Sequence, residues 1–136
     1  MLLLSIGGNI LGKNNFVIIL IIGILVFISG CTFLSTDLKV ITSDPKNGST
    51  NVSSNEDIKV TFNNKIKEGN RYIELKSSNG TIVPTNVTIS GKSLIITPKA
   101  LLKGTQYTLN LHSNSTADLE GNGLKNPTTI VFTTNE

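Results

Sequence analysis

Cysteine, histidine and tryptophan are almost absent from this 136-residue chain, which has one cysteine, Cys31, one histidine, His112, and no tryptophan. A lone cysteine excludes an intramolecular disulfide and a cysteine metal cluster, so the fold must be held together by packing. A lone histidine with no cysteine after residue 31 has no partner for a metal site or a nucleophilic centre. We expect His112 to be a solvated residue at the end of a strand.

Charge of either sign is also sparse. Twelve Lys and Arg stand against nine Asp and Glu, giving a formal net charge of +3, and the basic residues are scattered singly. A nucleic-acid-binding protein concentrates its basic residues on one face. We therefore expect no nucleic-acid partner.

Paired carboxylates for glycoside hydrolysis are not evident. Glu56, Asp57, Glu68 and Glu74 fall on separate predicted turns or strand faces, without a flanking aromatic cleft and without a tryptophan to stack on a sugar. The sequence therefore predicts a protein that is not an enzyme.

The longest apolar run lies near the N-terminus and ends at the only cysteine. Lys13 precedes an uncharged stretch from Phe16 to Ile28, and Ile28-Ser29-Gly30-Cys31 has the order of a lipobox. A charged, then apolar, then small-residue order is typical of a secretory signal. We predict that residues 1–31 are a signal peptide or membrane anchor and that Cys31 is lipidated.

The length of the apolar segment distinguishes between a cleaved signal peptide and an uncleaved membrane anchor. The apolar core spans about 13 residues, below the roughly 20 that a helix needs to cross a bilayer, which favours cleavage before Cys31. Stable anchoring then implies a diacyl modification, because one acyl chain binds a membrane only marginally. The alternative is an uncleaved signal-anchor helix that recruits Leu2 to Leu11 and Thr32 to Leu34. Both fates tether the chain to the extracytoplasmic face of the cell membrane.

After a short predicted tether at residues 32–37, apolar and polar residues alternate with a period of two. Such alternation is typical of strands with one buried face, and no helical period follows residue 31. Turn formers recur about every ten residues, for example in Asp44 to Gly48 and in Ser78-Asn79-Gly80. Residues 38–136 are therefore predicted to form an all-β, immunoglobulin-like sandwich of about seven antiparallel strands. The strands are expected around Leu38–Ile41, Ile58–Phe62, Ile73–Leu75, Val87–Ile89, Leu94–Ile96, Tyr107–Leu111 and Ile130–Phe132.

One local pattern is typical of immunoglobulin-like sandwiches. Leu102, Gly104 and Tyr107 are spaced so that a glycine turn leads into a strand that opens with tyrosine. This is the arrangement of a tyrosine corner, in which the phenol bonds back to upstream backbone. An ordinary half-buried tyrosine is the alternative.

These segments resemble the bacterial Ig-like domains of the SbsA type, which occur in S-layer and surface proteins of bacteria and archaea. The resemblance spans Val40 to Thr134 and implies a surface-exposed structural module, often found in tandem arrays, whereas this chain carries one copy. The segments that carry it are Pro45 to Val52, Ile58 to Phe62, Asn79-Gly80-Thr81, Leu94 to Pro98, Leu102 to Leu109, Asp118 to Asn122 and Phe132-Thr133-Thr134.

The segment Asp118 to Gly123 resembles the first half of a calcium loop. Asp118, Glu120 and Asn122 supply oxygen ligands at alternate positions before a glycine at the sixth, but Thr129 occupies the twelfth position, where a bidentate acid is expected. Two readings follow: a structural turn in which Asp and Asn bond local backbone, or a bound calcium ion. The structural turn is the preferred reading, so no cofactor is expected, and calcium is the alternative.

Five sequons occur, and the candidate glycosylation sites among them are Asn47, Asn79 and Asn114. Asn79 and Asn114 fall in predicted loops and are the preferred positions.

Taken together, these patterns predict a membrane-tethered surface module with a structural or adhesive role, whose partner is an envelope polymer or a surface protein. Exposed edge strands would let it pair with a partner strand. The alternative is a lipoprotein that binds calcium or a glycan through the loops at one end of the sandwich.

Overall fold

The computed structural model describes residues 36–136, in which every regular element is a β-strand. None of these residues forms a helix that could span a membrane. The predicted signal or anchor helix, Cys31 included, lies outside the described residues. Ten strands follow one another: β1 (Val40–Asp44), β2 (Ser49–Val52), β3 (Ile58–Phe62), β4 (Ile66–Glu68), β5 (Ile73–Ser77), β6 (Thr85–Ser90), β7 (Ser93–Pro98), β8 (Gln106–Leu111), β9 (Thr116–Asp118) and β10 (Thr128–Thr134).

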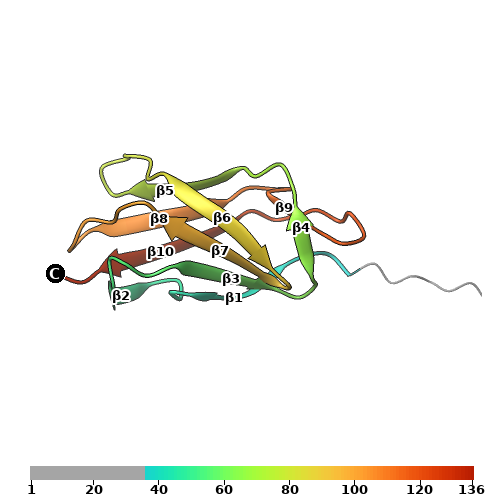
Figure 1. Cartoon of the computed structure of the whole chain (residues 1–136), viewed down its shortest axis with the longest axis horizontal. Helices are drawn as coiled ribbons and strands as arrows, with labels where there is room; N and C mark the ends of the chain where they lie inside the picture. The colour runs from blue at the N-terminus through green and yellow to red at the C-terminus, as the bar shows by residue number, and fades with distance from the viewer. Residues whose placement is uncertain (1–35) are drawn as a thin grey trace, which may run out of the picture. The chain divides into compact units, whose positions relative to one another are not determined.

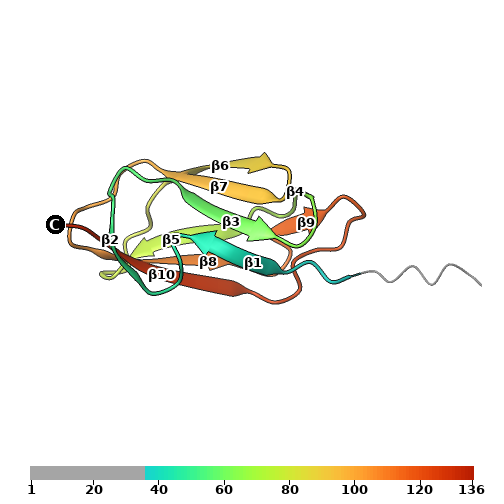
Figure 2. The ribbon, with the colours of Figure 1, turned by 90° about the horizontal axis from the view of Figure 1, so that it is seen from below.

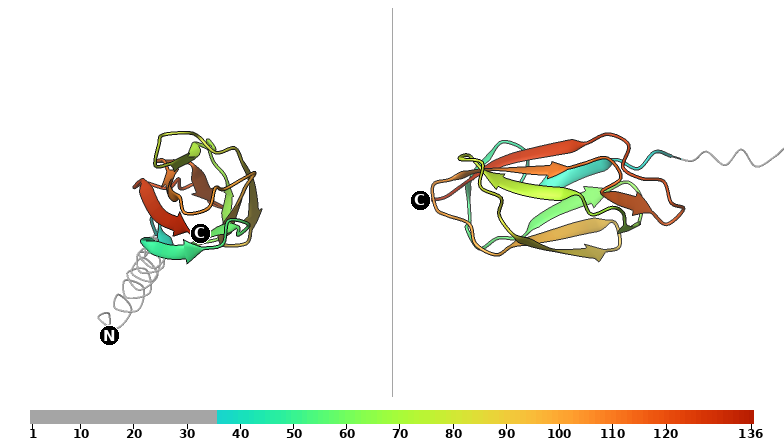
Figure 3. Two further views of the ribbon diagram at one scale, coloured as in Figure 1. Left: turned by 90° about the vertical axis from the view of Figure 1, so that its left-hand side faces the viewer. Right: turned by 90° about the horizontal axis from the view of Figure 1, so that it is seen from above.

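Eight of these strands form two four-stranded sheets that pack face to face, as an immunoglobulin-like sandwich does (Figures 1 and 2). The strand order is β1-β3-β7-β6 in one sheet and β2-β10-β8-β5 in the other, while β4 and β9 pair separately. Thr36 and the C-terminal Glu136 lie at opposite ends of the domain (Figure 3). The strands of the two four-stranded sheets run broadly between these two ends, whereas β4 runs across them (Figure 1).

The first stretch of chain is shared between the two sheets. β1 pairs with β3 in the antiparallel sense, the chain then passes through the cis Asp44–Pro45 peptide, and β2 runs parallel to β10. The prediction of antiparallel strands alone is therefore wrong at β2. Its sequence, Ser-Thr-Asn-Val, has a single apolar residue, so no alternation reveals it.

The alternation also does not predict two further strands, β4 and β9. Each has three residues, too few for an alternation, and they pair with each other between Ile66 and Asp118 and between Glu68 and Thr116. The first strand is also displaced from its predicted position, because β1 begins at Val40 and Leu38 precedes it as a buried residue.

The core consists of the inward side chains of both sheets, as the alternation predicts. β8 supplies its centre, since Leu109 and Leu111 are completely buried and lie between β5 and β10. The buried apolar residues are Leu38, Val52, Ile58, Val60, Phe62, Ile66, Leu75, Leu94, Ile96, Tyr107, Leu109, Leu111, Leu124, Ile130 and Phe132.

The predicted inward positions of β6 are less buried than the alternation indicates. Val87 is 36% exposed and Ile89 is half-buried. β6 ends its sheet and β5 ends the other, so both strands border the same open side of the sandwich. Side chains on an edge strand receive neighbours from one side only, which explains their exposure.

Candidate functional site

The loop from Asp118 to Asn122 is organised around the Asp118 carboxylate, which is 2% exposed. Its Oδ1 accepts hydrogen bonds from the backbone N–H groups of Glu120 (3.0 Å) and Asn122 (2.8 Å). Its Oδ2 accepts from the side-chain amides of Asn122 (2.9 Å) and Asn64 (3.4 Å). The carboxylate thus joins its own loop to the β3–β4 connection.

These donors also set the protonation of Asp118. The side-chain hydrogen bond from Asn122 is the main cause that lowers the pKa of the Asp118 carboxyl below 3.8, while burial acts in the opposite direction. The four N–H donors therefore stabilise Asp118 in its charged carboxylate form.

The three predicted calcium ligands are near one another but do not converge. Glu120 is exposed, and its Oε2 lies 3.5 Å from the Asn122 amide nitrogen rather than beside Asp118. Within residues 36–136, no three acidic, histidine or cysteine side chains are grouped to hold a metal. Calcium binding here stays a prediction, which a calorimetric titration of the domain with Ca²⁺ tests.

The segment before β8 has the hydrogen bonds that a tyrosine corner requires. The Tyr107 hydroxyl accepts a 2.7 Å hydrogen bond from the backbone N–H of Leu102. Thr134 Oγ1 donates to the Leu102 carbonyl (2.7 Å) and accepts from the Thr105 N–H (3.0 Å). Gly104 has φ +58°, which a glycine adopts without strain. The turn before β8 is therefore fixed by two buried side chains.

Replacing Tyr107 by phenylalanine tests this corner. We expect Tyr107→Phe to lower the free energy of unfolding by about 1 kcal/mol, because the Leu102 N–H loses its acceptor while the ring stays packed on Phe132. Urea denaturation measures the change. Tyr72→Phe is the matched control, since Tyr72 is 54% exposed. If the two variants had the same urea midpoint, the Tyr107 hydroxyl would have no structural role.

The three candidate glycosylation sites differ in what their side chains contact. Asn47 Oδ1 accepts the Val131 N–H (2.8 Å), which ties the turn before β2 to β10. Asn79 is exposed in the turn after β5, and its Oδ1 accepts the Thr81 N–H (3.0 Å). Asn114 is exposed with φ +59°. Glycan attachment at these residues stays a prediction that peptide mass analysis tests.

His112 contacts two residues of the β5 side. Its ring centroid lies 4.0 Å from that of Tyr72, and its Nε2 is 3.3 Å from Glu74 Oε2. Hydrogen bonds to Lys76 and to His112 lower the pKa of the Glu74 carboxyl, and the one to Lys76 has the larger effect. The imidazole is 37% exposed, so His112 is half-buried at the surface rather than simply solvated.

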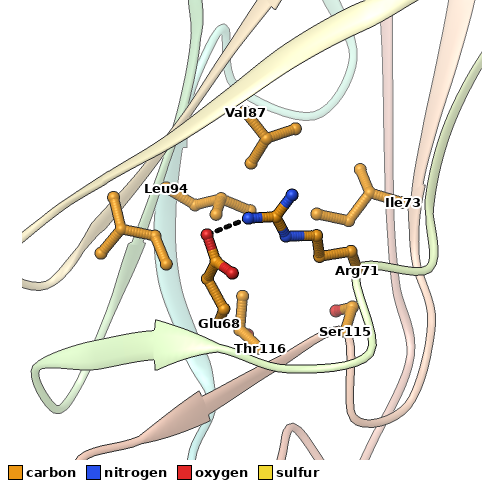
Figure 4. Close-up of a pocket in the computed structure, with 8 residues that line it drawn as sticks. Glu68, Arg71, Ile73, Val87, Leu94, Ser115 and Thr116 are labelled. Atoms are coloured by element: carbon orange, nitrogen blue, oxygen red, sulfur yellow. Dashed lines mark hydrogen bonds and ion pairs between the residues drawn. The ribbon is translucent and has the colours of Figure 1, made fainter.

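A small cavity opens on the side of the sandwich between β5 and β6 (Figure 4). Arg71 and Glu68 form an ion pair across its mouth, and Ile73, Val87, Ile89 and Leu94 line its walls. Ser115 and Thr116 complete the lining, and their buried hydroxyl oxygens have no hydrogen-bond partner among the described residues.

The cavity volume limits what this site can hold. It is ≈ 20 Å³, enough for one water molecule and too small for a metabolite. No local sequence pattern predicts this site, because its residues come from four separate segments of the chain. Arg71 reaches it from a backbone with φ +57°.

A larger and shallower hollow adjoins this cavity. Its volume is ≈ 400 Å³, and it is lined by Arg71 and Ile73 on one side and by Thr85, Asn86 and Val87 of β6 on the other. It therefore borders the first half of β6. Its lining combines one arginine, two branched apolar side chains, one threonine and one asparagine.

Solved structures share this fold at low sequence identity. The N-terminal part of the bacterial S-layer protein SbsC matches with TM-score 0.56 and 20% identity, over 74% of this chain and 24% of that one. CopC from Methylosinus trichosporium OB3b matches with TM-score 0.57 and 15% identity, over 72% and 93% of the two chains. PcoC, a methionine-rich copper resistance protein from Escherichia coli, matches with TM-score 0.54 and 16% identity, over 73% and 99%.

The S-layer likeness therefore involves one part of a longer protein, since the chain spans about a quarter of that relative. The only methionine here is Met1, so the described domain is not methionine-rich. No curated protein matches the sequence. The profile of the bacterial Ig-like domain matches residues 35–134, and the chain belongs to that family.

Proposed function

We propose that this protein is an extracytoplasmic Ig-like module that is tethered to the cell membrane and acts by contact, in a structural or adhesive role. The observation that carries the proposal is the place of the family match, which begins at residue 35, four residues after the predicted lipobox cysteine. Leu38 is already fully buried in the core. The sandwich thus follows the predicted anchor with almost no linker.

The tether is the lipid on Cys31 or, as the alternative, an uncleaved signal-anchor helix. Either one holds the domain by its Thr36 end. The opposite end, with Glu136, then faces away from the attachment point (Figure 3). Non-catalytic contact with an envelope polymer or a surface protein is the role that this arrangement favours, and the S-layer neighbour supports it.

The surface chemistry of the described domain agrees with a contact role. Its exposed side chains are mainly Ser, Thr, Asn and Lys, and a shallow hollow borders residues 85–87 of the edge strand β6. Edge strands recruit partners through main-chain hydrogen bonds and do not require a deep pocket.

A retention assay tests the adhesive role. The fragment Thr36–Glu136, a compact unit with its own core, is mixed with isolated bacterial envelopes and sedimented, with and without Ca²⁺. We expect saturable retention that Ca²⁺ does not change. Retention that requires Ca²⁺ and is lost in Glu120→Gln would instead support the cation-binding alternative, and no retention on any envelope would contradict adhesion.

A further inference from the structure

The outer edge of β6 pairs with no strand among the described residues, although β4 passes close to β6. β6 is the last strand of its sheet and pairs only with β7. Among the described residues, no backbone hydrogen bond beyond that pairing involves residues 85–90. Asn86, Val87, Thr88 and Ser90 are exposed. Every second N–H and C=O group along this edge is therefore available to another strand.

The composition of β6 does not protect this edge. Natural edge strands are usually blunted by charged residues, by proline or by a covering segment. The sequence of β6, Thr-Asn-Val-Thr-Ile-Ser, has neither charge nor proline. β1, the other edge of the same sheet, ends in Asp44, whereas β5 contains Glu74 and Lys76 and is partly covered by an isolated bridge from Ile82.

The ≈ 400 Å³ hollow gives room for the side chains of an added strand. It borders Thr85, Asn86 and Val87, the first half of β6, and Arg71 and Ile73 line its other side. Figure 4 shows Val87 facing these two residues across the mouth of the small cavity. A strand added to β6 would direct every second side chain toward this hollow, and an apolar side chain there would cover Val87.

We propose that the added strand is β6 of a second copy of this chain, paired antiparallel about a two-fold axis at Thr88. In that register Val87 faces Ile89 of the second copy, and the reverse pair forms by symmetry. Thr88 faces its own counterpart on the opposite side of the sheet. All these residues are β-branched, and no charge opposes another. The strand is therefore complementary to itself.

The proposed register determines how the two copies are oriented. Antiparallel pairing reverses the strand direction, and β6 runs between the two ends of the domain (Figures 2 and 3). The Thr36 ends of the two copies then point in opposite directions. If each copy is tethered at that end, which rests on the proposed function, the contact joins two facing membranes rather than two neighbours on one membrane.

Disulfide trapping in the fragment Thr36–Glu136 tests the register. The fragment has no cysteine, because Cys31 is the only one in the chain, so a single introduced cysteine reports one position. Thr88→Cys should form a dimer under mild oxidation, since the paired Cα atoms would lie about 4.5–5.5 Å apart, within the range of a disulfide. Thr42→Cys, exposed on edge strand β1, is the control. Cross-linking of Thr88→Cys no faster than that of Thr42→Cys would overturn the proposal.

Sedimentation equilibrium tests the association without cross-linking. We expect a reversible dimer whose Kd rises at least about tenfold in Val87→Lys, where two like charges enter the interface and two apolar pairs are lost. Ile41→Lys is the matched control on β1, where Ile41 is 59% exposed, and should leave Kd unchanged. Circular dichroism confirms that both variants fold.

The outcomes separate this inference from the proposed function. A fragment that stays monomeric, or a dimer that Ile41→Lys disrupts and Val87→Lys does not, overturns the β6 contact. If a monomeric fragment is still retained on envelopes, the adhesive role stands with a different partner. Aggregation of vesicles that carry the tethered chain, lost in Val87→Lys, would support the contact between facing membranes.

Discussion

Gly69→Ala is expected to destabilise the domain by about 3 kcal/mol. A Cβ atom at residue 69 would overlap the carbonyl oxygen of Asn114 and lie 2.8 Å from the carbonyl carbon of Ser115. Both neighbours are backbone atoms, so no side chain can rotate away to make room. The expected loss of stability is therefore at the upper end of the range for overpacked sites. The hydrogen bond from the Asn70 N–H to the Asn114 carbonyl (2.9 Å) would be strained as well.

Equilibrium unfolding in urea measures this effect. Gly80→Ala is the control: residue 80 has φ +86° and nothing lies within 4 Å of its added Cβ, so only the backbone cost of about 1 kcal/mol applies. If Gly69→Ala were no less stable than Gly80→Ala, the close contact between residue 69 and the backbone of residues 114–115 would not require a glycine. A wider separation of these two segments would also displace Arg71 and Ser115 at the small cavity.

Asp118→Asn is expected to cost about 3 kcal/mol. The carboxylate accepts four N–H donors, two on each oxygen, and hydrogen bonds to a charged group are the stronger class. An amide in its place keeps the size but turns an NH₂ group toward the donors of Asn122 or of the loop backbone. The unpaired donors would be left partly buried. Thermal and urea unfolding of the variant measure the loss.

The same hydrogen bonds predict how stability depends on pH. The folded protein has a lowered Asp118 pKa, so the unfolded chain binds this proton first as the pH falls. The stabilisation is complete above the unfolded value of 3.8 and is lost as the pH falls through the folded pKa. We expect wild-type stability to decline more steeply below about pH 4 than that of Asp118→Asn.

Glu120→Gln is the matched control in the same loop, because the Glu120 side chain is exposed and accepts none of the hydrogen bonds that hold Asp118. It should change neither stability nor acid sensitivity. A wild type and an Asp118→Asn variant with parallel stability curves between pH 2 and 6 would show that the carboxylate does not organise the loop.

Alternation predicted most of the sandwich because its core strands carry the pattern in full. In β3, Ile58, Val60 and Phe62 are buried, while Lys59 is exposed. The pattern failed where a strand is too short or too polar to show it, as in β2, β4 and β9. It also overestimated the burial of Val87, since a sequence does not reveal which strand ends a sheet.

The candidate site was predictable only in part. Local spacing placed Asp118 beside Glu120 and Asn122, and the structure brings Asp118 and Asn122 into contact. The donor on Asn64 comes from a connection 54 residues earlier in the chain, which no local pattern discloses. The cavity under Arg71 likewise depends on how β4, β5, β6, β7 and β9 meet. Such long-range contacts follow from the sheet order, which short motifs do not encode.

Membrane association and accessibility of the full chain test the central claim most directly. The chain is expressed in a bacterium that processes lipoproteins, the cells are converted to spheroplasts, and these are treated with protease before membranes are separated. We predict that the domain is found in the membrane fraction and is digested in intact spheroplasts. Cys31→Ser should release it if the tether is lipid and leave it bound if the tether is a helix. A wild-type domain that is soluble inside the spheroplasts and protected from protease would contradict the account.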